Sequence, residues 1–144
     1  MIALDTNILV HAHRADSRFH EPARRCLRAL AEGREAWGIP WPCVHEFIGV
    51  VTHPRIFQPP SPIELALDQV AAWLESPALV MLGEDAGYFE RLSALAVRAG
   101  ATGPRIHDAR VAALCLLHGV SELWSADRDF GRFPELTVRN PLIA

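Results

Sequence analysis

Residues 1–10 read MIALDTNILV, and this stretch decides the fold that the chain can adopt. The apolar run MIAL at residues 1–4 is typical of a short buried strand, and residues 7–14 carry apolar side chains at helical spacing. Asp5 or Thr6 lies between these segments and can cap the helix. A strand that passes directly into a helix is the repeating unit of α/β proteins, and here it leaves the Asp5 carboxylate at the end of a strand.

The rest of the chain repeats this alternation. Apolar periodicity predicts further helices at residues 19–33, 41–53, 62–76, 85–100 and 107–119, and further strands at residues 36–40, 78–82, 122–126 and 136–140. The segment HPRIFQPPSP at residues 53–62 predicts a proline-rich loop between two helices. Together these elements predict an α/β fold with a short, mostly parallel central sheet.

Length and composition limit the class of protein. The chain has 144 residues, 50% of them hydrophobic, so we expect a single domain over residues 1–144. No apolar run approaches the roughly eighteen residues that span a bilayer, and the N-terminus lacks the pattern of a signal peptide. Cys26, Cys43 and Cys115 fit neither a disulfide framework nor a zinc motif. We therefore expect a cytoplasmic protein whose cysteines are core thiols.

The charge of the chain bears on its partners. The formal net charge is −3, which argues against a nucleic-acid partner. If four of the 17 acidic residues bind a metal, the remaining 13 face 14 basic residues, all of them Arg. Arginine suits bidentate contacts to phosphate, so the charge balance does not exclude RNA.

Acidic residues follow the predicted strands or open the predicted helices. Asp5 follows the first strand, Asp108 lies in the first turn of a helix, and Asp127 and Asp129 follow a late strand in SADRDF. Each has a simple explanation when taken alone, since Asp5 and Asp127 can cap the turns after them and the helix dipole favours Asp108. Taken singly, these positions need no shared function.

Glu46 lies in the helical segment CVHEFIGVV, residues 43–51, whose other residues are nearly all apolar or small. A Glu on the outer face of a helix is usually solvated. Cys43 and Val50 flank Glu46 at i−3 and i+4, so we expect its side chain to face partly buried surface. A carboxylate in that position is costly unless it is paired or binds a metal.

Considered together, the acids indicate one shared site. Several lie on the side of the sheet where the strands end, and this is the crevice in which α/β proteins bind ligands. Carboxylates gathered in one crevice repel each other, so their coexistence implies a compensating cation. Oxygen ligands without Cys or His at ligand spacing select hard cations such as Mg²⁺ or Mn²⁺. Such an ion activates water and binds the oxygens of a phosphodiester.

Four segments in this order resemble the PIN-domain ribonucleases, and specifically the VapC toxins of bacterial toxin–antitoxin pairs. They are LDTNILV at residues 4–10, HEF at 45–47, HDARVAAL at 107–114 and SADRDFGRFP at 125–134. The resemblance covers essentially the whole chain. It implies a three-layer α/β/α sandwich, usually homodimeric, that cleaves RNA with Mg²⁺ or Mn²⁺ and is silenced by a cognate VapB-type antitoxin.

The resemblance also implies roles for individual residues. The catalytic, metal-binding acids would be Asp5, Glu46, Asp108 and Asp127, with Asn7, Ser125 and Asp129 in supporting roles. Relatives vary between the positions of Asp127 and Asp129, so either residue can be the fourth acid.

Four arginines lie within a few residues of these acids, and we expect some of them to position RNA phosphates. They are Arg14, Arg105, Arg110 and Arg128. Pairing with acidic side chains, or simple solvation, explains them equally well.

Other functions are compatible with parts of the pattern. A metal-free ribonuclease would use His45 or His107, but adjacent residues on a helix point about 100° apart, so we expect both to turn away from the cleft. A phosphatase-like hydrolase would use Asp5 as a nucleophile, and Asn7 then stands where a second acid is needed. A catalytically inactive PIN-like module that binds RNA or protein would have lost an acid, and none of the four is missing. The sequence leaves the RNA target and the number of metal ions open.

Overall fold

The computed structural model describes residues 1–143, and its centre is a five-stranded sheet with the strand order β3-β2-β1-β4-β5. The strands are β1 (Ile2–Leu4), β2 (Trp37–Pro40), β3 (Leu79–Leu82), β4 (Glu122–Trp124) and β5 (Val138–Arg139). Every pair of neighbouring strands runs parallel. The predicted parallel sheet is therefore confirmed.

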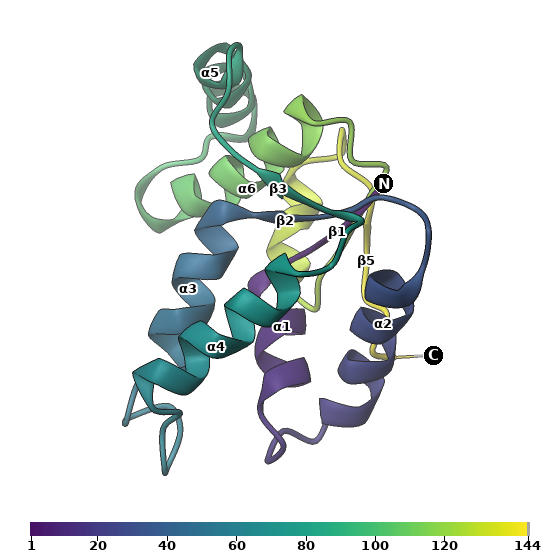
Figure 1. Ribbon diagram of the computed structural model, residues 1–144. Helices are drawn as coiled ribbons and strands as arrows, with labels where there is room; N and C mark the ends of the chain where they lie inside the picture. The colour runs from purple at the N-terminus through teal and green to yellow at the C-terminus, as the bar shows by residue number, and fades with distance from the viewer. Residues whose placement is uncertain (144) are drawn as a thin grey trace.

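Helices cover both faces of this sheet. They are α1 (Thr6–His13), α2 (His20–Glu32), α3 (Trp41–Val51), α4 (Ile63–Leu74), α5 (Tyr88–Ala99) and α6 (Ile106–Leu117), with short 3-10 helices η1 (Gly103–Arg105) and η2 (Arg128–Arg132). Figure 1 shows α5 and α6 on one side of the sheet and α1 and α2 on the other. The three-layer α/β/α sandwich expected from the sequence is confirmed. No helix within residues 1–143 is long and apolar enough to cross a membrane.

The last two strands are shorter than the sequence pattern predicts. We expected residues 122–126 and 136–140, whereas β4 ends at Trp124 and β5 contains Val138 and Arg139. For β4 the cause is local hydrogen bonding: the Ser125 hydroxyl accepts the N–H of Asp127, and the Asp127 carboxylate accepts the N–H of Asp129. These bonds turn the chain out of the sheet and into η2.

Apolar side chains fill the space between the layers. α6 buries residues around most of its circumference, because α5 packs on one side and the sheet and α3 on the other. Phe47 of α3 packs on Trp73 of α4 with ring centroids 4.8 Å apart, and Trp73 is only 6% exposed. Trp73 thus belongs to the core, whereas Phe89 of α5 is 72% exposed.

The register of the central strands brings distant residues together. Leu4 of β1 pairs with Trp124 of β4, and the backbone N–H of Asp5 donates to the Trp124 carbonyl at 3.0 Å. Because parallel strands end at the same edge, Asp5 and Ser125 leave the sheet side by side. The fold thereby joins two segments that lie 120 residues apart in the sequence.

Candidate metal centre

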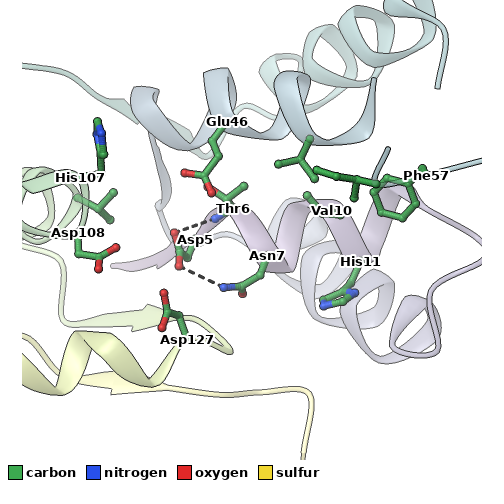
Figure 2. Close-up of a pocket in the computed structure, with 13 residues that line it drawn as sticks. Asp5, Thr6, Asn7, Val10, His11, Glu46, Phe57, His107, Asp108 and Asp127 are labelled. Carbon is green, nitrogen blue, oxygen red and sulfur yellow. Dashed lines mark hydrogen bonds between the residues drawn. The ribbon is translucent and has the colours of Figure 1, made fainter. Parts of the chain in front are cut away.

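The four acids predicted from the sequence line one cavity of about 340 Å³. Asp5 follows β1, Glu46 lies on α3, Asp108 lies in the first turn of α6, and Asp127 precedes η2. Figure 2 shows their carboxylates gathered around a common space, with the Glu46 carboxylate pointing toward Asp5. Elements from four parts of the chain thus place acidic side chains at one edge of the sheet.

Asp5 is the most constrained of these acids. Its Oδ1 accepts the backbone N–H of Thr6 at 2.9 Å and faces the Cys43 thiol at 3.4 Å. Its Oδ2 accepts the Ser125 hydroxyl at 2.7 Å and the Asn7 amide at 3.3 Å. Asp5 is therefore the N-cap of α1 and also lines the acidic cavity. The sequence suggested either a helix cap or a member of an acidic site, and the same carboxylate does both.

Asn7 and Ser125 connect the two loops that carry the acids. The Asn7 amide donates to Ser125 Oγ at 3.2 Å, and its carbonyl oxygen accepts the N–H of Ala126 at 3.0 Å. Ser125 is 2% exposed, and its hydroxyl also accepts the N–H of Asp127 at 3.0 Å. The structure thus brings both supporting residues into direct contact with the segment that carries the acids.

The acids raise one another's pKa. Burial raises the pKa of Asp5, while the hydrogen bond from Ser125 opposes this effect. Partial desolvation raises the pKa of Glu46, and the charges of Asp5 and Asp108 raise it further. Desolvation, followed by the charges of Asp127 and Asp5, raises the pKa of Asp108 to about 6. Burial and mutual repulsion thus both disfavour the charged forms of these acids, and a bound cation would relieve both effects.

The residues fit a divalent cation. One carboxylate oxygen from each of Asp108, Asp127 and Asp129 lies within 4.8 Å of the other two. All of these donors are hard oxygen atoms, which Mg²⁺ and Mn²⁺ prefer. Thr6 also lines the cavity, and its buried hydroxyl has no hydrogen-bond partner among residues 1–143.

Glu46 and Asp129 differ from the other acids in exposure. Glu46 lines the cavity and its carboxylate is partly desolvated there, as we expected, although the residue as a whole is exposed. The reason is that Cys43 and Phe47 take the buried side of α3. Asp129 is also exposed, although it belongs to the close group with Asp108 and Asp127.

The predicted RNA-contacting arginines separate into two groups. Arg14 pairs with Asp16 at 2.7 Å, and Arg110 pairs with Glu84 at 2.7 Å, so two of these guanidinium groups are already engaged. Arg105 and Arg128 are exposed and form no salt bridge within residues 1–143.

His107, which we expected to turn away from the cleft, is one of the residues that line the acidic cavity. Figure 2 shows its ring pointing away from the carboxylate of Asp108, so His107 contributes to the wall of the cavity without facing the acids. His45 behaves as expected, because it stacks on Trp41 at 6.1 Å and does not line this cavity.

Sequence reasoning missed several residues in or behind the wall of the cavity. Cys43 was interpreted only as a core thiol, yet its Sγ contacts Asp5. Its spacing of three residues before Glu46 on the same helix face was the available signal. His11, Ile56 and Phe57 also line the cavity, and no local pattern marks them because a loop brings the last two there.

This fold and this acidic cavity together define a class of protein. The sequence matches the model of the PIN domain over residues 2–136, so the chain belongs to the PIN-domain family.

Within the family, the relatives with similar sequences are VapC proteins. Ribonuclease VapC43 of Mycobacterium tuberculosis strain H37Rv is 39% identical over 142 residues, which cover 99% of this chain and 96% of the relative. Ribonuclease VapC48 of the same strain is 30% identical over 137 residues, covering 95% and 94% of the two chains. The resemblance to VapC-type PIN-domain proteins that the motifs indicated is therefore confirmed.

Solved structures support the same fold. VapBC2 from Rickettsia felis, bound to a promoter DNA fragment, matches with a TM-score of 0.70 at 20% identity, covering 97% of this chain and 98% of the other. VapC20 from Mycobacterium tuberculosis, a Sarcin-Ricin loop cleaving toxin, matches with a TM-score of 0.69 at 18% identity, covering 97% and 100%. At these identities the likeness concerns the fold alone.

Proposed function

We propose that this protein is a metal-dependent endoribonuclease and the toxin of a VapBC-type pair. The observation that carries the proposal is the convergence of Asp5, Glu46, Asp108 and Asp127 in one cavity. The relatives named VapC are ribonucleases at up to 39% identity over nearly the whole chain, which supports the same activity here. Because the substrate would be cellular RNA, we place the protein in the cytoplasm.

Asp5, Asp108 and Asp127 would hold Mg²⁺ or Mn²⁺, with Glu46 and Asp129 available as further oxygen ligands. When bound, the cation supplies Lewis acidity, which acidifies water and offsets the negative charge that develops on the phosphate. Asp5 would be the metal ligand with a fixed orientation, because Thr6 and Ser125 orient its two carboxylate oxygens.

The less constrained acids would adapt to the substrate. Glu46 and Asp129 are exposed and have room to change rotamer when a phosphodiester enters. Of the arginines, Arg105 and Arg128 would position RNA phosphates, since their guanidinium groups are not engaged in salt bridges within residues 1–143. Arg128 also lines a second cavity, to which Asp127 contributes as well. RNA that extends beyond the acidic cavity would bind there.

Nucleophilic catalysis by Asp5, as in a phosphatase-like hydrolase, is disfavoured by its surroundings. Both carboxylate oxygens accept hydrogen bonds, and the residue is only 7% exposed. A carboxylate held in this way orients a metal better than it attacks phosphorus.

We also propose a VapB-type antitoxin and a second copy of the chain as partners. Structural neighbours include toxin–antitoxin complexes such as VapBC from Salmonella typhimurium and FitAB bound to IR36 DNA. An antitoxin arginine that enters the crevice would inhibit by competing with the cation for the carboxylates. On α5, Phe89 and Val97 are 72% and 84% exposed, which offers an apolar surface to a second copy.

The test is cleavage of total cellular RNA by the purified protein, free of antitoxin, with Mg²⁺, with Mn²⁺ and with EDTA. We expect discrete fragments that require metal and are absent with Asp108→Asn. Intact RNA in every lane, from protein that circular dichroism shows to be folded, would refute the ribonuclease assignment.

A further inference from the structure

The cavity that contains the acids has a second, apolar end. Val10 and Phe57 lie at that end, and Val50 of α3 and Ile56, from the same loop as Phe57, add further apolar lining to the cavity. Figure 2 shows Phe57 and Val10 at one end of the cavity and Asp108 and Asp127 at the other. Catalysis by a metal accounts for the acidic end only, so the apolar end requires a different explanation.

Arg14 supports the Phe57 ring, which is the aromatic side chain at the apolar end of the cavity. Its guanidinium lies over the Phe57 ring, 4.3 Å from the centroid. The same guanidinium pairs with Asp16 at 2.7 Å and donates to Ser61 Oγ at 3.2 Å. Arg14 does not line the acidic cavity, whereas Phe57 does, so the arginine supports the ring from outside.

The loop at residues 53–62, which carries Phe57, is anchored at both ends. The N–H of Phe57 donates to the His53 carbonyl at 3.0 Å, and the N–H of Ser61 donates to the Val51 carbonyl at 2.8 Å. The Ser61 hydroxyl, in a residue 5% exposed, also bonds to His13 Nε2 at 3.0 Å. An anchored loop presents Phe57 in a fixed orientation, which lowers the entropic cost of binding a ligand there.

The geometry points to an unpaired nucleobase as the occupant of this apolar end. In RNA a planar apolar base is covalently tied to each phosphate, so a phosphate at the acids brings a base to the adjoining wall. Aromatic side chains are the usual platform for single-stranded bases. The His11 ring also lines the cavity, and since its Nδ1 bonds to Ser17 at 2.6 Å, its Nε2 is available to a base edge.

We propose that Phe57 is a specificity-determining residue that stacks on an unpaired base next to the scissile phosphate, with Arg14 as its positioning residue. This inference rests on the proposed ribonuclease function. It favours RNA over an antitoxin side chain as the occupant, because one RNA ligand fills both the acidic and the apolar end of the same cavity.

The test uses an oligoribonucleotide that contains a mapped cleavage site. Two further versions carry an abasic nucleotide, on one side or the other of the scissile phosphate. For the wild type we expect one of the two abasic substrates to lower kcat/KM by roughly tenfold or more, in line with the loss of one base stack. Phe57→Ala should lower kcat/KM on the intact substrate by a similar factor and should no longer distinguish intact from abasic RNA.

Two further variants separate stacking from folding. Phe57→Leu keeps an apolar side chain without a ring and should also lose the discrimination, whereas Phe57→Trp should keep it. Mn²⁺ affinity, measured by calorimetry, should equal that of the wild type in all three variants, because none alters an acid.

The results that contradict the inference are distinct from those that contradict the ribonuclease function. If Phe57→Ala remains as sensitive to the abasic substitution as the wild type, the base-stacking role is wrong. If Phe57→Ala leaves cleavage intact and weakens only antitoxin binding, the occupant is a protein side chain and the inference is also wrong. If the wild type cleaves no RNA with metal present, the ribonuclease function itself fails.

Discussion

Asp5 combines two functions that the sequence presents as alternatives. It caps α1 through the N–H of Thr6, and the same carboxylate lies in the acidic cavity. Burial raises its pKa, and hydrogen bonds from Ser125 and Thr6 partly offset that effect. The protein thus stabilises one carboxylate with fixed donors, whereas the charged forms of Asp108 and Glu46 would gain most from a bound cation.

Replacing Asp108 should separate activity from stability. In Asp108→Asn we expect cleavage to fall by about 100-fold or more, because a charge that binds the cation is removed. The melting temperature in EDTA should rise by about 3 °C, because carboxylate repulsion in the cavity is relieved. Calorimetric melting alongside the cleavage assay checks both effects, and a lower melting temperature would show that the cavity is not electrostatically strained.

Asp5→Asn should behave differently from Asp108→Asn. An amide at this position presents an NH₂ group to the Ser125 hydroxyl or to the N–H of Thr6, both of which donate to Asp5 in the native protein. We expect the free energy of unfolding to fall by about 1–3 kcal/mol, since buried donors lose their acceptor. Urea unfolding in EDTA measures this, and an increase in stability, as expected for Asp108→Asn, would contradict the hydrogen-bond account.

At the scale of elements, the site depends on the contact between the loop after β1 and the loop after β4. Ser125 bridges them, since its hydroxyl donates to Asp5 and accepts from Asn7 and Asp127. We expect Ser125→Ala to weaken Mn²⁺ binding by about 10- to 100-fold, the usual effect of removing a residue that orients a metal ligand. Ser125→Thr keeps the hydroxyl and is the matched control. Equal Mn²⁺ affinity in the alanine variant and the wild type would rule out this orienting role.

The arginines of different elements should have different effects on RNA cleavage. Arg105 of η1 and Arg128 of η2 are exposed, so we expect Arg105→Ala and Arg128→Ala to raise KM and to reduce the salt dependence of RNA binding. Arg14→Ala should leave the salt dependence unchanged and reduce the discrimination between intact and abasic substrates, because Arg14 is neutralised by Asp16. Binding measured at several salt concentrations distinguishes these outcomes, and a reduced slope for Arg14→Ala would assign it a phosphate contact.

The elements that the sequence predicted well are those set by local pattern. Apolar periodicity located every strand and α-helix, and the order of strands and helices predicted the parallel sheet. The predicted end of β4 was wrong because side-chain hydrogen bonds at Ser125 and Asp127 override the β propensity of the segment. Phe57 was not predicted to line the cavity, because its position depends on contacts of its loop with His13 and Arg14. No local sequence pattern encodes these contacts.

For the whole molecule, the acidic cavity should make metal-free stability depend on pH. The pKa of Asp108 is about 6 in the folded protein and 3.8 in an unperturbed carboxyl, so the unfolded state loses this proton first as pH rises. Stability in EDTA should therefore fall between about pH 4 and pH 6 and level off above that range. Burial raises the pKa of Asp5 as well, which adds to the same trend.

Melting temperatures measured in EDTA across this pH range test the electrostatic account. We expect a shallower dependence for Asp108→Asn than for the wild type, because the variant lacks one titrating group. Identical profiles for the two proteins would mean that Asp108 titrates normally and that the acids do not interact.

The central claim is that the converging carboxylates form one cation site. The most direct measurement is a calorimetric titration of Mn²⁺ into the antitoxin-free wild type, Asp108→Asn and Asp68→Asn, an exposed acid on α4 that serves as the matched control. The account predicts saturable binding by the wild type and Asp68→Asn and at least a tenfold loss of affinity in Asp108→Asn. Equal affinity in all three proteins would contradict it.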